Sequence, residues 1–105
     1  MVDISAVPLA LVTGAAQRIG AAIVRTLHGA GFEVILHYHH SRTAAASLAQ
    51  ELNQQRPRSV HVLQANLLDP AQLEKLTQDT LALRGTLNLL VNNASRFYPT
   101  PLGSV

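Results

Sequence analysis

The sequence has no cysteine, no tryptophan and few charged residues, which make up 13% of its 105 positions. The absence of cysteine excludes a disulfide scaffold, and an apolar content of 48% excludes a disordered chain. A self-sufficient domain of this size usually carries about a quarter of its residues charged. The low charge therefore suggests that part of the surface is covered by other polypeptide, and the length allows one domain or less.

Long apolar runs are absent as well. The most apolar stretches, residues 9–12 and 87–91, are far shorter than the roughly 18 residues that cross a bilayer. Residues 1–8 lack the basic and apolar parts of a secretory signal, so we expect a cytoplasmic protein with no membrane partner. The eight basic residues outnumber the six acidic ones, but they are scattered along the chain, which argues against a nucleic-acid partner.

Apolar strands alternate with helices along the chain. Short apolar runs predict strands at residues 8–13, 33–38, 59–64 and 87–91. Apolar spacings of three and four residues predict helices from Ile19 to Gly29, from Ser41 to just before Pro57, and from Asp69 to Gly85. Ser41 and Asp69 are the expected N-caps. The alternation predicts an α/β fold with a doubly wound parallel sheet of the Rossmann type.

The fourth predicted strand is too apolar for the edge of a sheet, where it would promote aggregation. We therefore expect residues 1–105 to form only the N-terminal βαβαβαβ part of a single Rossmann-type domain. The remaining strands would then lie on further polypeptide of the same gene product or on a second chain.

A glycine-containing segment, Thr13-Gly-Ala-Ala-Gln-Arg-Ile-Gly20, joins the first predicted strand to the first predicted helix. At this junction the unpaired N–H groups of a helix N-terminus can bind a pyrophosphate. Gly14 permits the tight turn, and Gly20 permits close packing of helix on strand. Arg18, whose guanidinium group can grip a phosphate, and Ile19 complete the predicted cofactor loop. The alternative is a glycine turn that only caps the strand.

The end of the second predicted strand and the residues after it read His37-Tyr-His-His-Ser-Arg42, a segment without a carboxylate. Folds that bind NAD place an Asp or Glu here to hold the ribose 2′-hydroxyl. Imidazole, hydroxyl and guanidinium donors suit a 2′-phosphate instead, so the sequence predicts NADPH as the cofactor. A metal site is the alternative for the histidines, but they lack helical spacing and a cysteine or carboxylate companion.

Polar residues follow the third and fourth predicted strands. Asn66 and Leu67 stand where they can flank an adenine, and the amide of Asn93 can hold a ribose or fix the strand ends. Each asparagine can instead close a turn through its own backbone. Further along, prolines stiffen the segment Arg96-Phe-Tyr-Pro-Thr-Pro101, so that Phe97 can stack on a planar heterocycle. The alternative for Phe97 is a packed loop.

Three of these segments resemble the pteridine reductases of the short-chain dehydrogenase/reductase superfamily. They are residues 13–20, residues 37–41 and Val91-Asn-Asn-Ala-Ser-Arg-Phe-Tyr-Pro-Thr-Pro-Leu102, and the match runs from about residue 8 to residue 102. Arg18, in place of the middle glycine of the superfamily pattern T-G-x-x-x-G-x-G, is typical of these reductases. Asn66 departs from the family, which commonly has aspartate at this position.

The resemblance implies an NADPH-dependent reductase of dihydropterins, and of folates, that works as a homotetramer. The implied contacts with phosphates and the adenosine phosphate are Arg18, Tyr38, His39, His40 and Ser41. The implied contacts with adenine and ribose are Asn66, Leu67, Asn93 and Ala94. Ser95 would bridge cofactor and substrate, Phe97 would sandwich the pterin against the nicotinamide, and Arg18 would also reach the substrate.

No catalytic residue is expected among these 105 positions. The resemblance places the family's catalytic Tyr-x-x-x-Lys pair and its catalytic aspartate beyond Val105, and the only lysine here is Lys75. Two alternatives remain. One is an NADPH-dependent reductase of ketones or acyl thioesters from the same superfamily, which has no use for Phe97, and the other is a non-catalytic dinucleotide-binding module.

Overall fold

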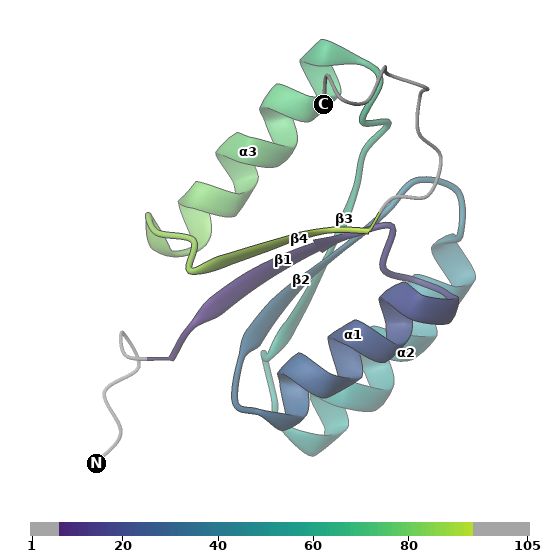
Figure 1. Cartoon of the computed structure of the whole chain (residues 1–105), viewed down its shortest axis with the longest axis vertical. Coiled ribbons are helices and arrows are strands. Elements are labelled where there is room, and N and C mark those ends of the chain that lie inside the picture. Colours follow the sequence, from purple (N-terminus) through teal and green to yellow (C-terminus); the bar gives the residue numbers. More distant parts are fainter. Residues whose placement is uncertain (1–6, 94–105) are drawn as a thin grey trace, which may run out of the picture.

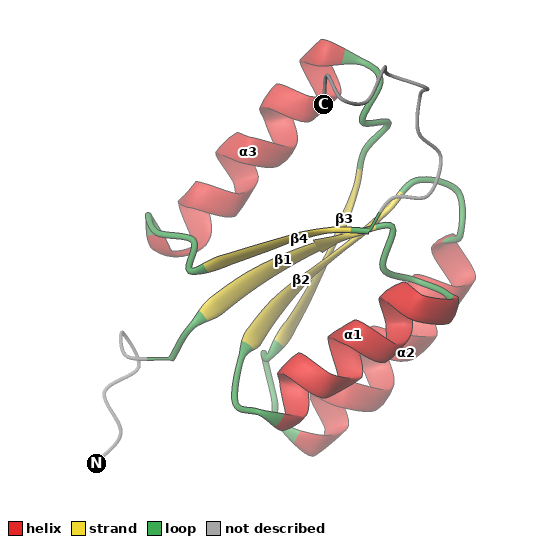
Figure 2. Ribbon diagram, viewed as in Figure 1, coloured by secondary structure: helices red, strands yellow, loops and turns green. Residues whose placement is uncertain are grey.

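Four parallel strands form the centre of the molecule, and helices cover both faces of the sheet (Figure 1). The computed structural model describes residues 7–93. The strands are β1 (Leu9–Thr13), β2 (Glu33–Tyr38), β3 (Val60–Gln64) and β4 (Leu89–Asn92), in the spatial order β3-β2-β1-β4. The helices are α1 (Arg18–Gly29), α2 (Arg42–Gln55) and α3 (Pro70–Arg84). The predicted α/β class and the βαβαβαβ order are confirmed (Figure 2).

Two apolar layers hold the helices to the sheet. On one face, side chains of β1 and β2 such as Val12 and Leu36 pack against α1 and α2, including Leu48. On the other face, Leu11 of β1 packs in a smaller cluster with Leu76 of α3. Every residue of β1 is buried because this strand has a strand on each side and apolar layers above and below it. This burial explains why the sequence of β1 is an uninterrupted apolar run rather than an alternating one.

Capping explains both boundaries of α3 but not the start of α2. Asp69 accepts a hydrogen bond from the N–H of Ala71 at 3.0 Å, and Gly85 ends α3 in a left-handed conformation at φ 72°, as predicted. Ser41 precedes α2, but its side chain makes no capping hydrogen bond, so the predicted capping role is wrong. Its backbone, at φ −87° and ψ 60°, lies outside the extended conformation from which a side chain usually caps.

The strand β4 begins two residues later than the sequence predicts. The side chain of Asn88 accepts a hydrogen bond from the N–H of Leu9 at 2.8 Å, where a strand backbone would offer its own carbonyl. Regular parallel pairing with β1 therefore starts at Leu89, which lies opposite Ala10. From there the exposure of β4 alternates, and Leu90 is 58% exposed.

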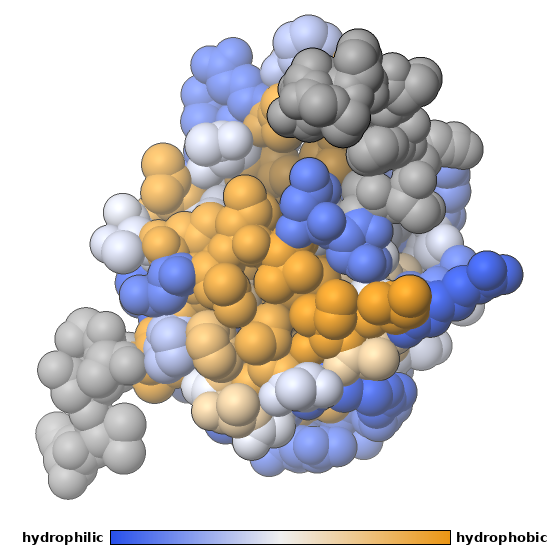
Figure 3. Space-filling view, in the orientation of Figure 1, coloured by the Kyte–Doolittle hydropathy of each residue, from blue (hydrophilic) through white to orange (hydrophobic). Residues whose placement is uncertain are grey.

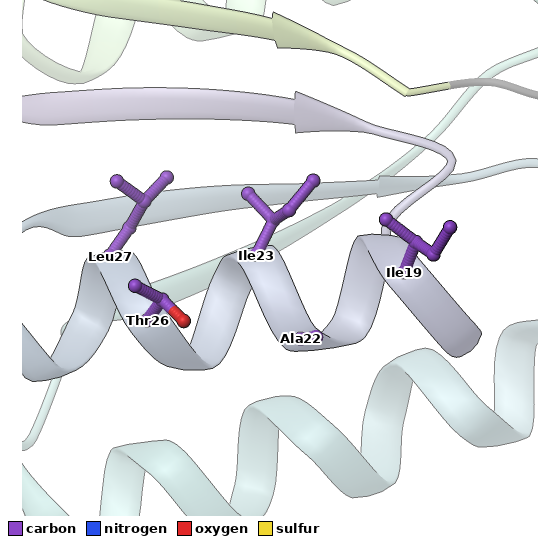
Figure 4. Close-up of a pocket in the computed structure, with 5 residues that line it drawn as sticks. All are labelled: Ile19, Ala22, Ile23, Thr26 and Leu27. Atoms are coloured by element: carbon purple, nitrogen blue, oxygen red, sulfur yellow. The ribbon is translucent and has the colours of Figure 1, made fainter.

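An apolar surface includes Leu90 of β4 and Ile19 of α1, which are 58% and 69% exposed (Figure 3). Within it, a shallow groove of about 280 Å³ runs along one side of α1 and is lined by Ile19, Ala22, Ile23, Thr26 and Leu27. The side chains of Ile19, Ile23 and Leu27 point from α1 to the side on which the strands lie (Figure 4). Among the described residues, no helix is both long and apolar enough to span a membrane.

Candidate functional site

The carboxyl ends of all four strands open into one cleft of about 1000 Å³. The chain runs from β1 outward to β2 and β3 and then returns to place β4 on the other side of β1. In open α/β sheets, ligands bind at such a reversal, in the crevice outside the carboxyl ends of the strands. The cleft contains residues that follow each strand, together with residues of α3, and its volume is at the upper end of the range for small-molecule sites.

The first wall of the cleft is the loop between β1 and α1. Gly14 has φ 60°, a conformation that glycine adopts without steric cost, and it turns the chain directly after the strand. The N-cap residue of α1, Gln17, makes no capping hydrogen bond through its side chain, and the first turn contains no acidic residue. The helix therefore presents its N-terminal N–H groups and positive dipole end without a side chain that neutralises them, as an anion site requires.

Arg18 lies in the same wall and also has a left-handed backbone, with φ 55°. This is the position at which the superfamily pattern has its middle glycine. For a residue with a Cβ this conformation costs on the order of 1 kcal/mol. The side chain is exposed at the cleft, so its guanidinium group can reach a ligand there. Strain at a residue that faces a cleft is a feature of functional sites.

Gly20 holds the start of α1 against the loop and β4. A Cβ at this position would stand 2.3 Å from the carbonyl oxygen of Gly14 and 2.7 Å from Nδ2 of Asn93. Asn93 itself donates from Nδ2 to that same oxygen at 3.1 Å and from its backbone N–H to Oγ1 of Thr13 at 2.9 Å. Of the three roles that the sequence left open for Asn93, these hydrogen bonds correspond to the one that fixes the strand ends, and the residue also lines the cleft.

His37 is a site residue that the sequence analysis missed. It is 2% exposed at the end of β2, accepts a hydrogen bond at Nδ1 from the N–H of Gly14 at 3.0 Å, and bonds through Nε2 to the carbonyl of Ala65 at 2.9 Å. Burial lowers the pKa of His37, and the carbonyl of Ala65 only partly offsets this effect. The available signal was a histidine at an inward position of an otherwise apolar strand.

The residues after β2 form the second wall. Tyr38 is buried, whereas His39 and His40 are exposed and their rings lie 3.7 Å apart between centroids. Ser41 lies beside them in the cleft. No described residue that lines the cleft is Asp or Glu. The site therefore contains donors and a cation but no carboxylate that would repel a phosphate.

Asn66 and Leu67 line the cleft after β3, as the sequence predicts. The side-chain oxygen of Asn66 accepts a hydrogen bond from the N–H of Leu68 at 3.0 Å, which closes a turn. Its backbone N–H donates to Oε1 of Gln72 at 2.8 Å. Asn66 thus has the turn role that the sequence left open, and it stands at the cleft with its side chain fixed.

The opposite wall is apolar. It is formed by Leu67 and Leu68 after β3, by Leu73 and Leu76 of α3, and by Leu90 of β4. Leu68 is 64% exposed and Leu73 is 45% exposed. The spacing of its apolar residues predicted α3 but did not connect its leucines with the site, because helical periodicity alone does not show which apolar residues a neighbouring strand leaves uncovered.

Three predicted contacts, Ala94, Ser95 and Phe97, lie outside the described residues. The other predicted site residues line the cleft, apart from Gly20, which packs against Gly14 and Asn93. Within residues 7–93 no three His, Cys, Asp or Glu side chains gather in a way that could hold a metal ion.

The sequence matches the family model of short chain dehydrogenases over residues 8–104. Pteridine reductase 1 of Leishmania tarentolae is 44% identical over 90% of this chain, which covers 39% of that protein. Versicolorin reductase 1 of Aspergillus parasiticus is 36% identical over 82% of the chain, which covers 32% of it. A 3-oxoacyl-(acyl-carrier-protein) reductase of Synechocystis sp. is 35% identical over 82% of the chain, which covers 34% of it.

The chain thus spans well under half the length of each of these relatives. The family match, which includes nearly every residue, agrees with the parallel sheet and with the position of the cleft at its carboxyl edge. The superfamily that the sequence motifs predicted is confirmed: the chain belongs to the short chain dehydrogenase family.

Proposed function

We propose that this chain supplies the NADPH-binding part of a reductase that converts dihydropterins, and dihydrofolate, to their tetrahydro forms. The observation that carries the proposal is the cleft at the reversal of strand order, whose described lining has donors from three loops and no carboxylate. A dinucleotide is long, and the cleft is correspondingly large and reaches the ends of all four strands.

The lining residues fit the parts of NADPH in order. The N–H groups at the start of α1 and the guanidinium group of Arg18 would hold the pyrophosphate. His39, His40 and Ser41 would bind the 2′-phosphate, with Tyr38 beneath them. The implied contacts with adenine and ribose are Asn66, Leu67, Asn93 and Ala94. NADPH, when bound, supplies the hydride, and the role of these residues is to orient it.

The pterin is proposed from sequence similarity. The relative with 44% identity is a pteridine reductase, and this chain has the Ser95 and Phe97 pair that would bridge the cofactor and stack on the substrate. These 105 residues contain no Tyr-x-x-x-Lys sequence. We therefore place proton delivery on polypeptide outside them, within a cytoplasmic homotetramer. Here the chain contributes binding and orientation rather than acid–base chemistry.

The cofactor is tested by binding alone. Titration of the complete protein with NADPH and with NADH, followed by nicotinamide fluorescence, should give at least tenfold tighter binding of NADPH, because each charge-assisted hydrogen bond to the 2′-phosphate contributes about 1.5–3 kcal/mol. Tighter binding of NADH would refute the assignment of the phosphate pocket.

The substrate is tested by turnover. NADPH oxidation by the complete protein is followed at saturating NADPH with dihydrobiopterin and, in parallel, with an acetoacetyl thioester. Oxidation with the pterin, lost in Phe97→Ala and retained in Phe97→Tyr, is the expected result, because tyrosine preserves the stacking ring. Unchanged pterin affinity in Phe97→Ala would refute the stacking role.

A reductase of acyl thioesters is the second candidate. It is favoured by the similarity to 3-oxoacyl-(acyl-carrier-protein) reductases, which reach 35% identity. Turnover with the thioester alone would establish it. Binding of NADPH without turnover of either compound would instead indicate a non-catalytic dinucleotide-binding module.

A further inference from the structure

The loop between β1 and α1 is fixed by a side chain that the proposed cofactor contacts do not include. We infer that His37 is a positioning residue: its neutral ring sets the conformation of Gly14 and so determines how tightly the loop binds the phosphates of a dinucleotide. The inference rests on the proposed cofactor site and deepens it. It concerns the pyrophosphate loop that NADPH and NADH would share, not the 2′-phosphate.

His37 is attached to the loop at two points. Its Nδ1 accepts from the N–H of Gly14 at 3.0 Å, and its backbone carbonyl accepts from the N–H of Ala15 at 2.9 Å. The carbonyl of Gly14 is held from the opposite side by Nδ2 of Asn93 at 3.1 Å. Both polar groups of the Gly14 backbone are therefore used, one by the end of β2 and the other by the residue after β4.

These contacts determine the proton positions on the ring. Nδ1 faces a backbone N–H, which can only donate, so Nδ1 must present its lone pair. The single proton of the neutral ring is then on Nε2, where it donates to the carbonyl of Ala65 at 2.9 Å. The ring thus spans from the loop after β1 to the end of β3, and each of its nitrogens has one partner of the matching kind.

Protonation of the ring would break this arrangement. A hydrogen on Nδ1 would point at the N–H of Gly14, so an attractive contact would become a repulsive one. The site also disfavours a charge: the ring is 2% exposed, and burial, together with the nearby His39, lowers the pKa of His37. The groups that contact the ring are the N–H of Gly14 after β1 and the carbonyl of Ala65 after β3. No described cleft residue is acidic, so no carboxylate there would stabilise the imidazolium.

Two substitutions separate the two ring nitrogens. In His37→Asn the amide oxygen occupies the place of Nδ1 and can still accept from Gly14, while the bond to Ala65 is lost. In His37→Gln the longer amide reaches the place of Nε2 and can donate to Ala65, while the N–H of Gly14 loses its acceptor. If the inference holds, His37→Asn binds NADPH close to wild-type affinity, whereas His37→Gln binds it about tenfold more weakly, because a buried donor is left unpaired.

NADH provides the internal comparison. Because both dinucleotides contain the pyrophosphate, His37→Gln should weaken the binding of NADH by the same factor as that of NADPH. The ratio of the two affinities should therefore stay unchanged. In the wild-type protein NADH affinity should fall as the pH drops below the lowered pKa of His37, and His37→Asn should remove this dependence. Equal affinities for wild type, His37→Asn and His37→Gln would overturn the inference, as would equal weakening in both variants.

His28 provides a matched control. It is also a buried histidine with a lowered pKa, and its Nε2 bonds to Oγ of Ser59 at 2.7 Å, but it lies near the amino ends of the strands, away from the cleft. His28→Asn should lower stability without changing the affinity for either dinucleotide. A loss of affinity there equal to that in His37→Gln would mean that destabilisation alone explains the effect, which would refute a positioning role.

The ring itself can be observed without any ligand. The ¹⁵N chemical shifts of the His37 imidazole in the complete protein at pH 7.5 should show a protonated Nε2 and an unprotonated Nδ1. The opposite tautomer would overturn the inference even if every variant failed to fold. Wild-type protein that bound neither dinucleotide would refute the proposed function itself, whereas equal binding by both variants would refute only the role of His37.

Discussion

Gly20 lies so close to Gly14 that a Cβ on Gly20 would stand 2.3 Å from the carbonyl oxygen of Gly14. Helix α1 therefore starts in direct contact with the turn that precedes it, and no other amino acid fits at position 20 without moving backbone. This contact holds the N–H groups of the helix at the mouth of the cleft, where a phosphate would bind.

Gly20→Ala should therefore lower the free energy of unfolding by about 3 kcal/mol, because the carbonyl oxygen of Gly14 and the Cα of Ala15 are backbone atoms that cannot move aside. Gly29→Ala, in the same helix, is the control: nothing lies within 4 Å of a Cβ there. It should leave stability unchanged or raise it by up to about 0.5 kcal/mol. Urea unfolding of both variants provides the comparison, and equal stabilities would contradict the close packing at Gly20.

Arg18→Gly should separate stability from function. Glycine adopts φ 55° without strain, so the variant should be about 1 kcal/mol more stable while binding NADPH about tenfold more weakly. Arg58 has φ 58° and lies in the turn before β3, away from the cleft. Arg58→Gly should give a similar gain in stability with unchanged NADPH affinity. A loss of affinity in both variants would show that the arginine at the cleft has no special role.

Replacing His39 and His40 together with alanine tests the 2′-phosphate pocket. Because both rings are exposed at the cleft, their removal should leave the fold intact and weaken the binding of NADPH by about ten- to a hundredfold. NADH, which lacks the phosphate, should bind as before. Isothermal titration with the two dinucleotides measures both effects, and an equal loss for NADPH and NADH would assign these histidines to some other part of the cofactor.

The buried histidines predict an acid-sensitive fold. The pKa of His28 is lowered chiefly by desolvation on burial and further by the positive charge of the nearby Arg56. A histidine with a lowered folded-state pKa takes up its proton more readily when unfolded. Its contribution to stability is therefore complete above the ordinary pKa of about 6.5 and declines as the pH falls below that value.

His28→Gln keeps a side-chain donor near Ser59 and removes the titration. Its unfolding free energy should therefore fall less between pH 7.5 and pH 5.5 than that of the wild type, as measured by urea unfolding at both pH values. An identical pH dependence in the variant would show that His28 does not contribute to the acid sensitivity.

The local residues determined the elements of this protein and their order. Apolar runs specified the strands, Asp69 and Gly85 specified the ends of α3, and Gly14 specified the turn between β1 and α1. These predictions succeeded because each depends on neighbours in the sequence: capping, turn conformation and apolar periodicity act over a few residues.

Tertiary structure decided what the side chains at the cleft do. Asn93 and His37 are 79 and 23 residues away from Gly14 in sequence, yet they hold the two sides of its backbone. A strand pattern shows only that a histidine points inward. Which nitrogen accepts, and from which loop, depends on the parallel register that sets the ends of β1, β2 and β4 side by side. The sequence alone therefore located the site, while the strand order β3-β2-β1-β4 determined which residues support it.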